Sequence, residues 1–278
     1  MIATMPLPYP FDTTEMQRAL LACIAVGAFA PTIGAFLVQK RLSLVGDGIG
    51  HVAFAGVGLG LLVGAAPVWT ALGFAVVGAV GVELLRAKKK AGGDLALALF
   101  FYAGIALGAV FATKAGVVDL EPYLFGDPLA MSPSGLAAVV LVGGVVAIGV
   151  WSLRHVLFAI VTDEAWSRVE GLPVDTLSVA LAALTAAVIV AGMKIVGLLL
   201  VAALMVLPVA SAQLLARSFR RTVLLAAGIG AASAFVGLAI GQLFHLSISG
   251  AIVLVAAAVF TVASLIRRSL PAAIGAAA

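Results

Sequence analysis

Long apolar runs, separated by short segments rich in charge, proline or glycine, make up almost the whole sequence. A helix of about 20 residues crosses the roughly 30 Å hydrocarbon core of a membrane. Apolar runs near that length occupy residues 16–38, 43–64, 68–86, 94–113, 134–153, 174–192, 194–215, 222–243 and 249–266. We expect an all-α polytopic membrane protein with about nine transmembrane helices, or with eight, because two runs meet in a very short turn at Gly192 to Lys194.

The composition excludes an ordinary soluble domain. Of the 278 residues, 64% are hydrophobic and 10% are charged, and the mean hydropathy is +1.25. Soluble domains carry about 25% charged residues. The one cysteine, Cys23, excludes an intrachain disulfide framework and a cysteine-rich metal site. Residues 1–15 lack a basic region and a small-residue cleavage site and predict a mature tail, so we expect one transmembrane domain over residues 1–278.

The basic residues predict the topology. They number 16 and fall in short clusters between apolar runs, which argues against a nucleic-acid-binding surface. Thirteen lie inside if the cytoplasm holds Lys40-Arg41, Arg86 with Lys88 to Lys90, Arg154 with Arg168, Arg217 with Arg220 and Arg221, and Arg267-Arg268. Arg18, Lys114 and Lys194 then remain outside. The positive-inside rule therefore predicts an external N-terminus and a cytoplasmic C-terminus.

Residues 119–133, DLEPYLFGDPLAMSP, interrupt the series of runs. Three prolines and a glycine break the segment too often for it to span, yet it is too apolar for a solvated loop. We expect a short outer re-entrant or interfacial element here. Its acidic residues would either attract cations to the outer mouth or stabilise turns: Asp119, Glu121 and Asp127.

A second interruption, TDEAWSRVEGLPVDT at residues 162–176, carries the start and stop signals of a short cytoplasmic helix. Thr162 is the expected N-cap, Asp163 and Glu164 suit the positive end of the helix dipole, and Gly171 closes the C-terminus. The helix presents an apolar stripe made of Ala165, Trp166 and Val169. That stripe lies either on the membrane face of the chain itself or against a cytoplasmic protein.

Asp47 and His51 stand four residues apart within the second apolar run, so a helix places them on one face. An aspartate at the centre of a bilayer costs about 2.5–3.5 kcal/mol on insertion scales, which favours a functional role. The pair predicts a cation site near the cytoplasmic end of its helix. A helix-end cap or a buried hydrogen-bonded pair is the structural alternative.

One chain supplies only two ligands, whereas a closed zinc site takes four. Two copies related by a two-fold axis would supply two imidazoles and two carboxylates, a set that suits zinc and is tolerable for manganese. A site completed by water would equally suit an ion in transit. At the cytoplasmic side, Glu83 and Arg86 are spaced for an ion pair.

The sequence lacks the motifs of an enzyme. No G-x-x-x-x-G-K-[S/T] phosphate loop occurs, so any ATP that drives this chain is hydrolysed by another polypeptide. No nucleophilic triad, H-E-x-x-H helix or paired catalytic carboxylates occur in a plausible site. We therefore expect a protein that is not an enzyme and that binds no cofactor of its own.

Four stretches together resemble the membrane permease subunit of bacterial zinc and manganese ATP-binding-cassette importers. They are RLSLVGDGIGHVAFAGVGLG, VDLEPYLFGDPLAMSP, DEAWSRVEGLPV, and MKIVGLLLVAALMVLPVASAQLLARSF with GAIVLVAAAVF. The resemblance covers nearly the whole chain. It implies that Asp47 and His51 face the transport path. It also implies that the second interruption is a coupling helix that touches the ATPase through Asp163, Glu164, Ala165 and Gly171.

The resemblance implies a high-affinity importer in the bacterial plasma membrane, working by alternating access. Its partners would be cytoplasmic ATPase subunits, an extracellular metal-binding protein, a second copy of the chain and membrane lipid, with no nucleic acid. Zinc is the expected substrate because VDLEPYLFGDPLAMSP is most similar to the zinc-uptake branch, and manganese is the second choice.

Two other functions remain open. In a carrier or channel driven by an ion gradient, Asp47 and His51 would relay protons or bind the coupling ion. In a permease for a bulky chelate or vitamin, neither residue would be a ligand.

Overall fold

The chain folds almost entirely into helices. The computed structural model describes residues 9–87, 93–117 and 121–269, and within these ranges it contains helices and no strand. The helices are α1 (Thr14–Gln39), α2 (Val45–Val63), α3 (Pro67–Ala87), α4 (Gly93–Lys114), α5 (Glu121–Leu124), α6 (Pro133–Thr162), α7 (Glu164–Val169), α8 (Val174–Met193), α9 (Leu198–Leu215), α10 (Phe219–Leu243) and α11 (Ile248–Ser269). The predicted all-α fold is confirmed.

Eight helices in the described ranges are long and apolar enough to cross a membrane: α1, α2, α3, α4, α6, α8, α10 and α11. The predicted run at residues 194–215 forms α9, a shorter helix of 18 residues that contains Pro208. The expected number of about nine, with eight as the alternative, therefore describes this fold. The polytopic membrane class is confirmed.

The largest error in the predicted bounds concerns α6, which continues nine residues past the predicted end at residue 153. The charge at Arg154 predicts a helix end at this point. Its guanidinium instead donates a hydrogen bond to the Trp151 carbonyl oxygen and lies 4.2 Å from the centre of the Trp151 ring, so the helix surface accommodates it. At 30 residues, α6 is about 45 Å long.

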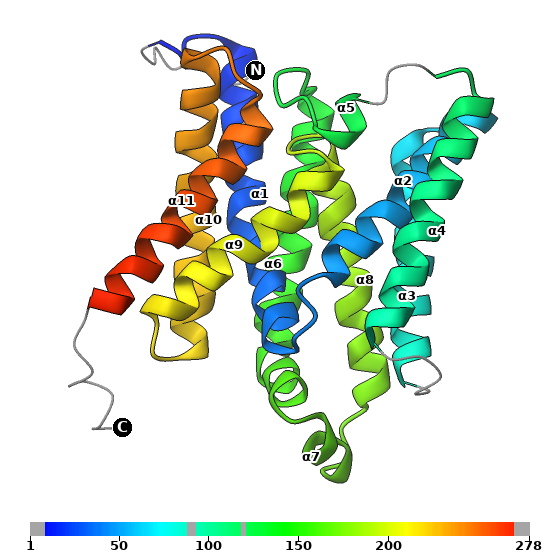
Figure 1. The fold of residues 1–278 in the computed structure, drawn as a ribbon, viewed down its shortest axis with the longest axis vertical. Helices are drawn as coiled ribbons and strands as arrows, with labels where there is room; N and C mark the ends of the chain where they lie inside the picture. Colours follow the sequence, from blue (N-terminus) through cyan, green and yellow to red (C-terminus); the bar gives the residue numbers. More distant parts are fainter. Residues whose placement is uncertain (1–8, 88–92, 118–120, 270–278) are drawn as a thin grey trace.

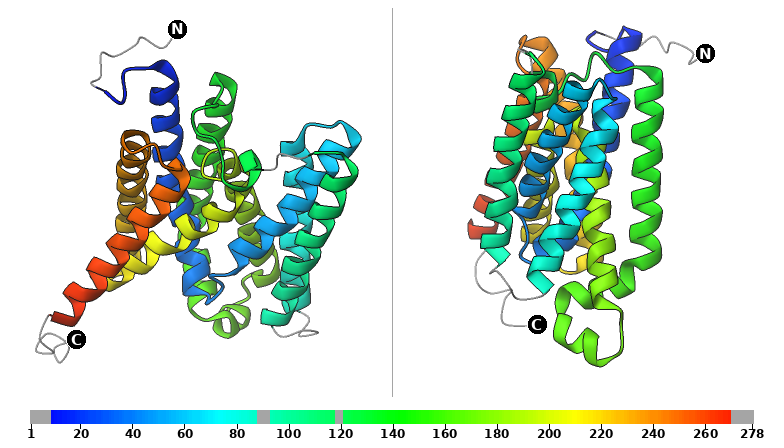
Figure 2. Two further views of the ribbon diagram at one scale, coloured as in Figure 1. Left: turned by 45° about the horizontal axis from the view of Figure 1, so that its top comes forward. Right: turned by 90° about the vertical axis from the view of Figure 1, so that its right-hand side faces the viewer.

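The helices form a bundle with α1 near its middle. Helix α2 packs between α3 and α4 on one side, and α1 contacts α10, α9, α6 and α8. Figure 1 shows α10 and α11 on the opposite side of the bundle from α3 and α4. The lower end of α6 and the short α7 project beyond the other helices in Figures 1 and 2.

The segment that follows α5 packs on the turn between α8 and α9. The backbone N–H of Asp127 donates to the carbonyl oxygen of Lys194 (3.1 Å), and the Ser249 hydroxyl of α11 donates to the carbonyl oxygen of Ile195 (3.3 Å). Gly197 lies in this turn with φ +86°, and a Cβ there would stand 2.3 Å from the Phe125 carbonyl carbon. Glycine therefore allows the close approach. The predicted short outer element corresponds to this segment.

Candidate functional site

Asp47 and His51 lie on one face of α2. The Nε2 atom of His51 is 3.9 Å from the Oδ1 atom of Asp47, beyond hydrogen-bond distance. The His51 side chain is 11% exposed, whereas the Asp47 side chain is 37% exposed. The two side chains therefore converge without satisfying each other, and the carboxylate keeps an open side.

Local structure explains the place of the aspartate. Asp47 lies in the first turn of α2, where the helix dipole favours a negative charge, and the N-cap residue Leu44 makes no side-chain hydrogen bond. In Figure 1 this end of α2 stands above the lower ends of α1, α6 and α8. The pair therefore lies in the first turns of its helix, at the end of α2 that follows α1, and its depth in the membrane stays a prediction.

Helix α4 holds His51 in place through two residues that the sequence analysis missed as neighbours. The Phe101 ring meets the imidazole edge-to-face, with 4.2 Å between the ring centres. A Cβ on Gly104 would lie 2.6 Å from the His51 carbonyl carbon, so only glycine lets the two helices come this close. The spacing of Gly104 and Gly108 indicates close helix packing. It does not reveal which helix or residue is the neighbour.

The described ranges contain no group of three or more His, Cys, Asp or Glu side chains that could hold a metal ion. Within these ranges, Asp47 and His51 are therefore not joined by a third side chain of this kind. The role of these two residues as metal ligands stays a prediction.

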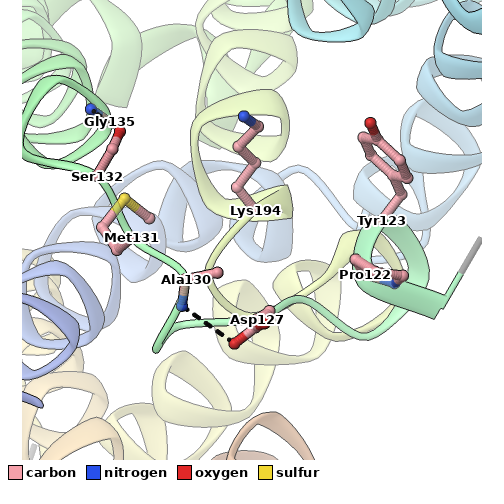
Figure 3. A pocket seen from close by; sticks show the side chains of 8 residues that line it. All are labelled: Pro122, Tyr123, Asp127, Ala130, Met131, Ser132, Gly135 and Lys194. Carbon is pink, nitrogen blue, oxygen red and sulfur yellow. Dashed lines mark hydrogen bonds between the residues drawn. The ribbon is translucent and has the colours of Figure 1, made fainter. Parts of the chain in front are cut away.

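A separate pocket of about 280 Å³ opens at the end of the bundle that carries α5 (Figure 3). Figure 3 shows the Lys194 side chain between Tyr123 on one side and Met131 and Ser132 on the other. The Asp127 carboxylate accepts hydrogen bonds from the backbone N–H groups of Leu129 (3.1 Å) and Ala130 (3.2 Å). Asp127 thus stabilises a turn, one of its two predicted roles. Asp119 lies outside the described residues.

The short helix expected at residues 162–176 is α7, but its N-cap is Asp163 and not Thr162. The Asp163 carboxylate accepts from the backbone N–H of Trp166 (2.9 Å). Thr162 instead ends α6 and donates its hydroxyl to the carbonyl oxygen of Phe158 (2.8 Å). Because α6 runs on to residue 162, the break between the two helices falls at the aspartate.

The remaining residues of α7 take different positions. Gly171 has φ +80° just after the helix and ends it, as predicted. Ala165 and Trp166 are exposed, so the apolar stripe has no partner within the described chain. Glu164 points toward cations of other helices, with its Oε2 atom 3.4 Å from an Arg86 nitrogen. The predicted Glu83–Arg86 ion pair is confirmed at 3.0 Å.

Comparison with known proteins shows similarity over almost the whole chain. Residues 12–267 match the family model for the ABC 3 transport family. The manganese transport system membrane protein MntC of Listeria monocytogenes is 31% identical over 252 residues, which cover 90% of each chain. The manganese import system permease protein ScaB of Streptococcus gordonii is 29% identical over 90% of this chain and 91% of its own.

A solved structure agrees with these relatives. PsaBC from Streptococcus pneumoniae, solved in complex with a Fab, contains a chain that superimposes with a TM-score of 0.84 at 28% sequence identity. The superposition covers 93% of this chain and 95% of that one. The family match, the relatives and the shared fold lead to one conclusion: the chain belongs to the ABC 3 transport family.

Proposed function

We propose that this chain is the membrane permease subunit of an ATP-driven importer of a divalent metal ion, moving its cargo to the cytoplasm by alternating access. The observation that carries the proposal is the Asp47–His51 pair, a buried imidazole beside a partly exposed carboxylate in a membrane helix. Membership of the ABC 3 transport family and the names of the curated relatives support it.

Manganese is the first metal to test and zinc the second. The resemblance on residues 118–133 favours zinc, whereas the two relatives named above are manganese permeases. Imidazole and carboxylate donors, with no thiolate, accept either ion. The donor atoms therefore do not distinguish the two metals, and the names of the two relatives favour manganese.

A second copy of the chain would complete the site. A two-fold axis along the pore brings together two histidines and two aspartates, which gives four protein donors. In this arrangement the open side of Asp47 faces the shared path. Weak coordination completed by water would let the ion leave again.

Two partners follow from this function. Cytoplasmic ATPase subunits would contact α7, whose exposed Trp166 and Val169 offer an apolar surface. An extracellular binding protein would deliver the metal to the opposite end. The protein would lie in the bacterial plasma membrane, with the N-terminus outside and the basic C-terminal end of α11 in the cytoplasm.

ATP-dependent uptake of manganese and zinc into proteoliposomes tests the proposal, using the permease co-expressed with its ATPase. His51→Ala should abolish metal uptake while the complex still assembles and hydrolyses ATP. His155→Ala is the matched control, because that histidine is exposed on the surface of α6. Uptake by the permease alone, without ATP, would support the gradient-driven carrier instead. Undiminished metal uptake by His51→Ala would favour a permease for a bulky chelate.

A further inference from the structure

Six charged side chains form one connected cluster at the end of the bundle that carries α7. Three are cations and three are anions, contributed by the turn after α1 and by α3, α7 and α8. They are Lys40, Glu83, Arg86, Glu164, Arg168 and Asp175. The cluster lies apart from the Asp47–His51 pair, and the proposed metal site does not use it.

Glu164 is the centre of this cluster. Its Oε2 atom is 3.4 Å from an Arg86 nitrogen and 3.8 Å from Lys40 Nζ, and its Oε1 atom is 3.1 Å from an Arg168 nitrogen. Arg168 also pairs with Asp175 at the start of α8. Through one carboxylate, α7 is joined to the ends of α1 and α3, which lie about 80 to 120 residues away in sequence.

The part of the cluster opposite α7 is buried. The side chains of Lys40 and Glu83 are 7% and 11% exposed, and Arg86 is 19% exposed. Lys40 Nζ also donates to the Ser178 hydroxyl of α8 (2.8 Å). Burial lowers the pKa of the Lys40 ammonium, and the Glu83 carboxylate opposes that shift. Charges this far from water are held in fixed positions by their partners, because an unpaired buried charge is costly.

The buried part adjoins the helix of the proposed metal site. Lys40 is the C-cap of α1, and α2 begins at Val45 with Asp47 in its first turn. The intervening turn is closed by backbone hydrogen bonds from Leu42 N–H to the Leu37 carbonyl oxygen and from Val45 N–H to the Leu42 carbonyl oxygen. A displacement of Lys40 therefore reaches the start of α2 through a short and well-bonded turn.

We propose that Glu164, with Lys40 and Arg86, is the link that transmits movement of α7 to the Asp47-bearing end of α2. The three residues are positioning residues and do not touch the metal. The inference rests on the proposed function, since it assigns the route by which an ATPase at α7 changes the metal site. The proposed link also explains why α7 points the Glu164 carboxylate toward the bundle while Trp166 and Val169 face outward.

Glu164→Gln tests the link with little risk to the fold, because the side chain is 38% exposed. Glu170→Gln is the matched control: it also removes a carboxylate at α7, where Glu170 accepts from the Trp166 ring N–H (2.9 Å) and has no role in the cluster. The ratio of metal imported to ATP hydrolysed should fall roughly tenfold in Glu164→Gln, within the 5–150-fold range of ordinary allosteric coupling. An unchanged ratio overturns the inference.

A second readout requires no metal. Leu44 precedes α2 and is 67% exposed, and the natural Cys23 is fully buried, so a spin label on Leu44→Cys reports the start of α2. ATP should change its spectrum in the otherwise unaltered complex and in Glu170→Gln, and should change it less than half as much in Glu164→Gln. Equal changes in all three, or no response to ATP in any, overturn the link. Absence of metal uptake with a normal spectral response would instead refute only the proposed cargo.

Discussion

The two groups of ionisable side chains in this protein are built in opposite ways. Around Glu164 three cations and three anions pair with one another, and the buried Lys40 reaches two carboxylates and a hydroxyl. At the start of α2, a histidine and an aspartate face each other across 3.9 Å, without a hydrogen bond between them. The first group is satisfied within one chain. The second has no hydrogen bond between its two members, as expected of the proposed site for a transported ion.

The contrast teaches how charge is used in a membrane bundle. Pairing at the cluster offsets the cost of removing charge from water, so those residues contribute to a fixed structure. An incomplete pair retains free donor capacity, so an ion or a second copy of the chain can gain from binding there. Substitutions in the two groups should therefore have different consequences, the first on the fold and its movements, the second on the cargo.

The largest expected effect is on uptake, from Asp47→Asn. Changing a group that only supports a metal ligand lowers metal affinity or activity about 10- to 100-fold. Loss of the charge of a proposed ligand should therefore lower metal uptake at least about 100-fold. Protein abundance and thermal stability should stay the same. The measurement is uptake of labelled manganese by proteoliposomes, with Asp12→Asn, exposed near the N-terminus, as the control. Retained uptake would remove Asp47 from the metal site.

Lys40→Met should reverse this pattern and act first on stability. It leaves Glu83 and Glu164 with fewer partners, and loss of a hydrogen bond to a buried charged group costs about 2 kcal/mol. Thermal unfolding of the purified protein should shift to lower temperature, while Lys40→Arg should retain most of the stability. If Lys40→Met is as stable as the parent, the cluster contributes no fixed structure.

Gly104→Ala should affect both fold and cargo, to a smaller degree. The added methyl group would overlap the His51 backbone at 2.6 Å, and such overpacking typically costs about 1–3 kcal/mol. We expect lower thermal stability together with a raised KM for metal uptake. Gly144→Ala, in open space on α6, serves as the control and should be neutral. Equal behaviour of the two variants would show that α4 does not position His51.

The smallest effect should be local to α7. Asp163→Ala removes the N-cap and costs about 1 kcal/mol, which faster amide hydrogen exchange in residues 164–169 should reveal. Thr162→Ala should leave exchange in α7 unchanged, because Thr162 bonds within α6. The opposite ranking of the two variants would restore Thr162 as the cap.

Much of this fold could be predicted from sequence because its spans are set by local properties. Apolar length fixes the helices, and the four-residue spacing puts Asp47 and His51 on one face whatever surrounds them. Gly171 ends α7 through its own backbone freedom. Such features depend on residues close together in the chain, so the sequence contains their cause.

The errors have an equally physical origin. The charge at Arg154 predicts a helix end only if no neighbouring side chain stabilises it. The Trp151 ring does so through a cation–π contact. The contacts of Phe101 with His51 and of Lys40 with Glu164 join different helices. Their side chains meet only because of how α2 packs on α4 and how α7 folds back toward α1. No local pattern encodes these pairings, although the identity of each partner is plain once the packing is known.

The length of α6 adds a geometric consequence. A helix of about 45 Å exceeds a hydrocarbon core of about 30 Å by some 15 Å, the length of about ten helical residues. When α6 stands near the membrane normal, it therefore acts as a spacer that holds α7 beyond the acyl chains, at the depth of the headgroups. A thicker bilayer shortens that projection and a thinner one lengthens it. The lipid composition of the membrane thus affects how far α7 projects beyond the acyl chains.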